Sequence, residues 1–95
     1  MKFSQKHTYL IVEGSQAGEF LQGQITIDVE KISDKDFMPS CICNNKGRVM
    51  ATFWIKKVKN GFKIVILEEL FISFEEHMKI YIPFFDAKLK KGSKD

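Results

Sequence analysis

Asn60-Gly61 is the strongest turn signal in this chain, because both residues tolerate the positive φ that a tight β-hairpin requires. A second turn signal, Asn44-Asn45-Lys46-Gly47, lies upstream. Runs rich in β-branched and apolar residues flank both turns, at 37–43, 48–58 and 62–67. The sequence therefore predicts three consecutive strands joined by two hairpins, in a sheet that is mostly antiparallel.

Helices and further strands are predicted on both sides of these hairpins. Residues 8–13 form a strand, and 16–23 form a short helix whose N-cap is Ser15. Residues 28–32 form another helical turn, capped by Asp28. Residues 68–81 form an amphipathic helix that Pro83 stops, and 84–89 form a last strand.

The predicted order is β-α-β-β-β-α-β, an α+β fold in which two helices pack on one face of the sheet. Ninety-five residues are enough for one small domain, residues 1–95. The polar residues from Lys90 onward, and 91–95 in particular, are expected to form a frayed tail.

Composition narrows the possible classes of function. The net charge is +3, and Arg48 is the single arginine among 15 basic residues, which argues weakly against a sequence-specific nucleic-acid reader. No apolar run is long enough to cross a bilayer, and no signal-type segment opens the chain, so we expect no membrane partner. Two cysteines make no disulfide framework, and the cytoplasm is the expected location.

Several reactive or aromatic side chains have simpler structural explanations. Cys41 and Cys43 lie two apart on one strand and are expected to be small core residues, since two thiols are too few for a tetrahedral metal site. His77 is expected at the surface or its boundary. Trp54 could stack on a ligand ring, but a core position is favoured. We predict no catalytic residue and no metal ligand.

Two segments carry a family resemblance. Phe20-Leu21-Gln22-Gly23-Gln24-Ile25-Thr26-Ile27-Asp28-Val29 is followed by Cys43-Asn44-Asn45-Lys46-Gly47-Arg48. Their order and spacing resemble the first module of the YgfZ family, the folate-binding relatives of the glycine-cleavage T-protein. The resemblance extends over about 9–90, and family members continue through further modules. It implies the first module of the aminomethyltransferase folate-binding fold.

The resemblance also implies a ligand and a role. The ligand would be folate (tetrahydrofolate), bound weakly or at an incomplete site, with Gln24, Thr26, Lys46, Arg48 and Thr52 as candidate binding residues. From the residues alone, the favoured reading of Gln22-Gly23-Gln24 is a helix stop with Gly23 in the left-handed conformation. The favoured reading of Lys46-Gly47-Arg48 is a hairpin tip with solvated charges. The implied role is iron–sulfur protein maintenance and tRNA modification, with iron–sulfur enzymes as clients.

The sequence differs from the T-proteins at two positions that matter for catalysis. Those proteins carry two acidic residues at the positions of Ala51 and Thr52, and neither residue can act as a carboxylate base. We therefore expect a non-enzymatic module, with a fragment of a folate-dependent aminomethyltransferase as the alternative. A truncated module should also expose Met38, Ile42 and Trp54, through which the chain could form homo-oligomers.

Overall fold

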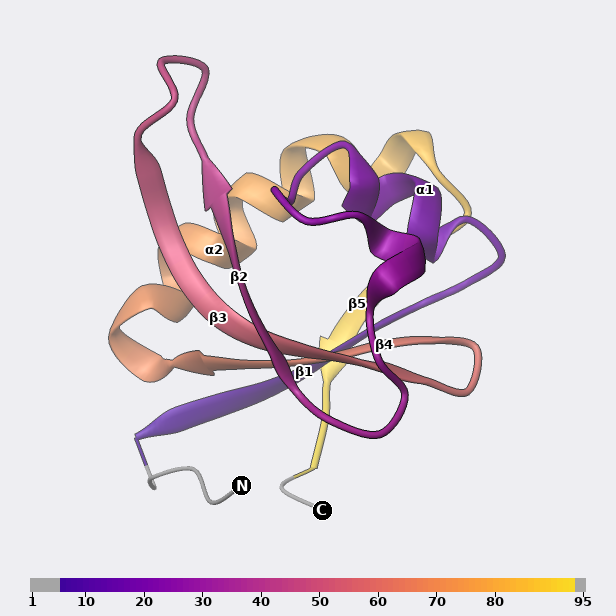
Figure 1. Ribbon diagram of the computed structural model, residues 1–95. Helices are drawn as coiled ribbons and strands as arrows, with labels where there is room; N and C mark the ends of the chain where they lie inside the picture. The colour runs from indigo at the N-terminus through magenta and orange to yellow at the C-terminus, as the bar shows by residue number, and fades with distance from the viewer. Residues whose placement is uncertain (1–5, 94–95) are drawn as a thin grey trace.

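The computed structural model describes residues 6–93, which form one five-stranded sheet and two α-helices (Figure 1). The strands are β1 (His7–Glu13), β2 (Met38–Cys43), β3 (Val49–Val58), β4 (Gly61–Leu67) and β5 (Lys88–Lys91). The helices are α1 (Ala17–Gln22) and α2 (Glu68–Tyr81), with 3-10 turns at Val29–Lys31 and Ile82–Phe84. This order confirms the predicted β-α-β-β-β-α-β arrangement.

The spatial order of the strands is β2-β3-β4-β1-β5, and each of the four pairings is antiparallel. β4 lies in the middle, and its residues from Gly61 to Ile66 are all buried. At the outer edge of β2, Ile25 forms an isolated bridge with Ile42, so the segment after α1 runs alongside that edge.

Both helices lie on the same side of the sheet (Figure 1). The core forms there because alternate strand residues point toward the helices. Phe20 and Leu21 of α1 and Phe74 and Met78 of α2 are fully buried, and the ring centroids of Phe53 and Phe74 are 5.2 Å apart. The strands contribute Leu10, Val12, Ile42, Ala51, Phe53, Ile55, Phe62, Ile64 and Ile66 to this core.

Most predicted elements are confirmed, α2 to the residue. Asp28 caps its 3-10 turn, since its Oδ1 accepts from the amide of Glu30 at 3.0 Å. Both hairpins are present. In the second one, Asn60 has a φ of 67°, but Gly61 already belongs to β4, so the turn lies one residue earlier than predicted.

Two predicted boundaries are wrong. Gln16 rather than Ser15 is the N-cap of α1, because the Ser15 hydroxyl donates to the carboxylate of Asp86 instead. The last strand is Lys88–Lys91 rather than 84–89, because Pro83 continues into a 3-10 turn.

The tail prediction is wrong for Lys90 and Lys91, which pair with β1, while residues 94 and 95 lie outside the described part. The amide of Gly92 also donates to the carbonyl of Tyr9 at 2.7 Å. Within residues 6–93, no helix is both long and apolar enough to span a bilayer.

Candidate functional site

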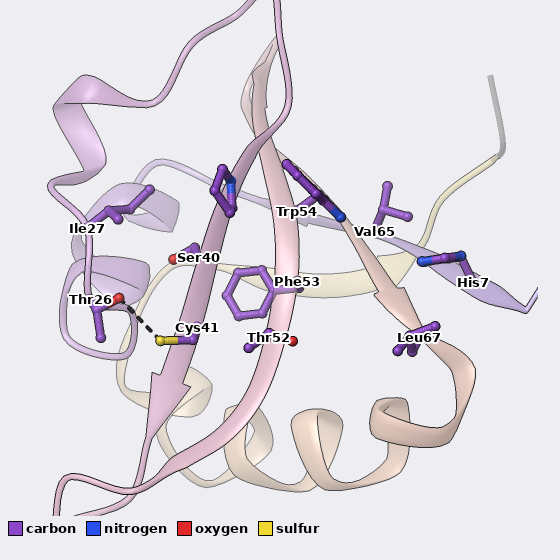
Figure 2. Close-up of a pocket in the computed structure, with 11 residues that line it drawn as sticks. His7, Thr26, Ile27, Ser40, Cys41, Thr52, Phe53, Trp54, Val65 and Leu67 are labelled. Atoms are coloured by element: carbon purple, nitrogen blue, oxygen red, sulfur yellow. Dashed lines mark hydrogen bonds between the residues drawn. The ribbon is translucent and has the colours of Figure 1, made fainter. Parts of the chain in front are cut away.

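A cavity of about 470 Å³ opens on the side of the sheet away from the helices, which we call the helix-free face (Figure 2). This volume is within the usual range for small-molecule sites. Its lining comes from four strands and from the segment after α1: His7, Thr26, Ile27, Pro39, Ser40, Cys41, Thr52, Phe53, Trp54, Val65 and Leu67.

Strand register explains why these residues meet. Successive side chains of a strand point to opposite faces, so the neighbours of the core residues point to the helix-free face. Trp54 of β3 lies opposite Val65 of β4, and Thr52 lies opposite Cys41 of β2. The cavity thus has an apolar centre around Trp54 and a hydroxyl and thiol end around Thr52.

The hydroxyl and thiol end is held in place by the segment after α1. The amide of Thr26 donates to the carbonyl of Cys41 at 3.3 Å, and Thr26 Oγ1 lies 3.5 Å from Cys41 Sγ (Figure 2). Ser40 also borders the cavity, but it lies opposite the core residue Phe53, so its side chain points to the helix side, where its hydroxyl is buried without a hydrogen-bond partner among residues 6–93. Thr26 and Thr52 therefore supply the hydroxyls that a ligand in this cavity can reach.

Both cysteines are free thiols and half-buried. Their expected place in the core is wrong, since Cys41 points to the cavity. Partial burial raises the pKa of the Cys43 thiol, and the neighbouring Cys41 raises it further. In the part of the chain that the structure describes, no three His, Cys, Asp or Glu residues gather as metal ligands.

Of the five candidate binding residues, the structure brings Thr26 and Thr52 to the cavity. Gln24 lies elsewhere, with its Oε1 3.1 Å from His77 Nε2 of α2. His77 is half-buried at this contact, as expected for a boundary residue, and burial lowers its pKa. Gln24 therefore connects α2 to the segment after α1.

Lys46 and Arg48 occupy the tip of the β2–β3 hairpin, apart from the cavity lining. Asn44 Oδ1 accepts from the backbone amides of both residues, at 2.9 and 3.0 Å, and Gly47 adopts a φ of 80°. These amides are therefore occupied within the turn, and only the exposed side chains of Lys46 and Arg48 could meet an anion.

Three further sequence expectations concern this region. Ala51 is 2% exposed on the helix side, so of the pair Ala51-Thr52 only Thr52 opens onto the cavity. Trp54 is half-buried in the cavity wall, which corrects its expected core position. Ile42 is fully buried, so its expected exposure is wrong.

Gln22 has a role that the sequence reasoning missed. Its Nε2 donates to the carbonyl of Ile27 at 3.1 Å, and its Oε1 accepts from the amide of Val29 at 2.8 Å. These two bonds close the loop that presents Thr26 and Ile27 to the cavity. The Gln22-Gly23-Gln24 motif was the available signal. His7 and Leu67, also missed, carry no local signal.

Comparisons with known proteins place the chain among distant relatives, although no family model matches it. Over 58 residues it is 29% identical to an aminomethyltransferase of Caldanaerobacter subterraneus subsp. tengcongensis, covering 61% of this chain and 16% of that protein. Over 78 residues it is 27% identical to the tRNA-modifying protein YgfZ of Buchnera aphidicola subsp. Schizaphis graminum, covering 82% of this chain and 24% of that protein.

A solved structure agrees with these matches in fold. The glycine cleavage system aminomethyltransferase T from Bartonella henselae superposes with a TM-score of 0.83, at 15% identity, over 92% of this chain and 24% of that one. The chain thus has the fold of one part of an aminomethyltransferase and weak sequence homology to both kinds of protein. It spans only a sixth to a quarter of the length of the curated relatives.

Proposed function

We propose that this chain is a folate-binding module of the YgfZ type, non-catalytic on its own, that serves iron–sulfur protein maintenance and tRNA modification. The observation that carries the folate proposal is the cavity on the helix-free face. The indole of Trp54 offers an aromatic surface there, and the hydroxyls of Thr26 and Thr52 offer hydrogen bonds. A planar, nitrogen-rich ring with polar edges suits such a lining.

The hydroxyl groups that line the cavity fit the polar edge of a folate ring, but they do not include a general base for group transfer. Thr26 and Thr52 can orient a ring through hydrogen bonds. When bound, folate would bring the capacity to carry one-carbon groups. A carboxylate base is lacking at the position of Thr52, which supports a binding role rather than aminomethyl transfer.

Trp54 fluorescence provides the binding test, with 5-formyltetrahydrofolate as the probe. We expect saturable quenching with an affinity weaker than about 1 µM, because one wall of strands leaves the ligand partly solvated. Thr52→Val should weaken binding several-fold. Thr8→Val is the matched control, since this substitution makes the same chemical change on the helix side of β1. No saturable binding, or an equal loss in both variants, would contradict the proposal.

Two further assays address the role. In a reconstituted glycine-cleavage reaction with the other components, we expect no turnover from this chain. Turnover would favour the alternative, a fragment of a folate-dependent aminomethyltransferase, to which the 29% identity points. Restored activity of iron–sulfur enzymes in cells that lack a YgfZ protein would support the maintenance role, and unchanged activity would count against it.

A further inference from the structure

The two cysteines of β2 lie next to each other on the helix-free face. Only the buried Ile42 separates Cys41 from Cys43, so the two thiols point to the same side of the strand. The side chain of Cys41 forms a hydrogen bond with the thiol of Cys43, which makes the two sulfur atoms close neighbours. Both thiols are free and half-buried, and Cys41 points toward Thr26 (Figure 2). The pair is therefore preformed and open to an ion from solvent.

A third sulfur atom lies across the strand pair from Cys43. The register of β2 and β3 shifts just before Cys43, which pairs with Val49, so Met50 is the extra residue of a bulge. Counting along β3 from Thr52, alternation places the side chain of Met50 on the helix-free face. Met50 is 36% exposed, so its thioether is accessible. Three sulfur ligands thus gather where β2 and β3 run into their hairpin.

The chemistry of these ligands selects a class of metal ion. Thiolate and thioether sulfurs are soft ligands, which prefer soft ions such as Cu(I) to Mg²⁺ or Ca²⁺. A structural zinc ion would need four ligands, and within residues 6–93 no third His, Cys, Asp or Glu joins the two cysteines. Cu(I), in contrast, is stable between two thiolates in line. The pair that is too small for zinc is therefore sufficient for Cu(I).

Positive charge lies in the turn that follows the second cysteine. Cu(I) held by two thiolates carries one net negative charge. Lys46 and Arg48 are exposed in the turn that begins next to Cys43, and their backbone amides already donate to Asn44 Oδ1. Only their side chains remain to act on a neighbouring anion, and these offset part of the negative charge of the complex.

We propose that Cys41 and Cys43 form a binding site for a soft monovalent metal ion, Cu(I), with Met50 as a weaker third ligand. Each thiol gives up its S–H proton to solvent, a sulfur–copper bond takes its place, and no oxidant or reductant is consumed. The inference goes beyond folate binding and does not depend on it, because Cys43 and Met50 lie outside the lining of the cavity.

The test is a competition for Cu(I) between the reduced full chain and the chelator bicinchoninate, with ascorbate present and oxygen excluded. We expect the chain to withdraw one Cu(I) from the coloured chelator complex. Cys43→Ser should weaken binding by about 100-fold or more, because one of the two thiolates is lost. Met50→Leu should weaken it several-fold. Met38→Leu is the matched control, since it makes the same chemical change at the other end of β2.

A second measurement uses Ag(I), which stays monovalent without a reductant. In the ¹⁵N-labelled chain, Ag(I) should shift the amide signals of residues 41–43 and 49–51, and the metal-free spectrum of each variant shows whether it is folded. The inference is overturned if the chain leaves Cu(I) with the chelator, or if Cys43→Ser and Met38→Leu have equal effects. Ag(I) shifts confined to His7 and His77 would likewise show that the thiols are not the ligands.

Discussion

The amide oxygen of Gln24 lies 3.1 Å from Nε2 of His77, which joins the segment after α1 to α2 across 53 positions of sequence. Because the amide oxygen is an acceptor, the imidazole donates through Nε2–H. The ring of His77 also lies against Tyr81, with 5.3 Å between the ring centroids. The motif residue that the resemblance offered as a ligand contact is therefore part of the packing between the two helical segments.

This contact predicts how stability depends on pH. Burial lowers the pKa of His77 from its ordinary value of 6.5, so the unfolded chain takes up the proton first as the pH falls. The free energy of unfolding should therefore decrease from about pH 6.5 downward until the folded pKa is passed. His77→Gln should flatten this decrease in urea unfolding at pH 7.5, 6.5 and 5.5. An NMR titration that gave His77 a pKa above 6.5 would contradict the prediction.

A second pH effect is expected where α1 begins. Hydrogen bonds from the side chain and the backbone of Ser15 lower the pKa of Asp86. Its contribution to stability is present above the ordinary carboxyl pKa and is lost as the pH falls through the lowered value. Ser15→Ala should raise the pKa of Asp86 in a carboxyl ¹³C titration. Ser73→Ala, at an exposed position of α2, is the control. If the pKa of Asp86 stayed unchanged in both variants, Ser15 would not be what lowers it.

Sequence patterns predicted the central elements well because they are defined locally. The hairpins follow from turn residues, and α2 follows from apolar spacing and a proline. β5 was predicted in the wrong place because three of its four residues are lysines, which local propensity does not favour in strands. Pairing with β1 forms it, and Lys90 Nζ lies 2.9 Å from Glu13 Oε1.

The sequence predicted only part of the candidate site, namely Thr26 and Thr52. Alternation within one strand correctly implies that Thr52 and Trp54 share one face, but it does not say which face the helices cover, and Cys41 joins them only through the register of β2 and β3. The core position expected for Trp54 failed for that reason. Trp54 and Val65 could not be paired from the sequence, because the register depends on where the second hairpin turns, one residue before the expected position.

Two glycine substitutions should have opposite effects on stability. A Cβ at Gly61 would collide with the backbone of Val12 and Glu13 in β1, and we expect Gly61→Ala to cost about 3 kcal/mol. Gly23 has a φ of −78° rather than the left-handed value considered from the sequence, and only ordinary contacts surround it. Gly23→Ala should therefore stabilise by about 0.5 kcal/mol. Urea unfolding checks both, and a large loss for Gly23→Ala would contradict the right-handed geometry.

Acidic substitutions at Ala51 and Thr52 test how the fold separates these two neighbours. Ala51 packs in the core beneath the helices, so Ala51→Asp would bury an unpaired carboxylate and should destabilise by about 3 kcal/mol or more. Thr52 is exposed on the helix-free face, so Thr52→Asp should cost less than about 1 kcal/mol. Urea unfolding of the two variants at pH 7 gives the comparison, and the identical charge change makes each the control for the other. Similar losses would show that Ala51 is not sealed from solvent. The expected difference would mean that one position alone, residue 52, could present a carboxylate to a ligand in this cavity.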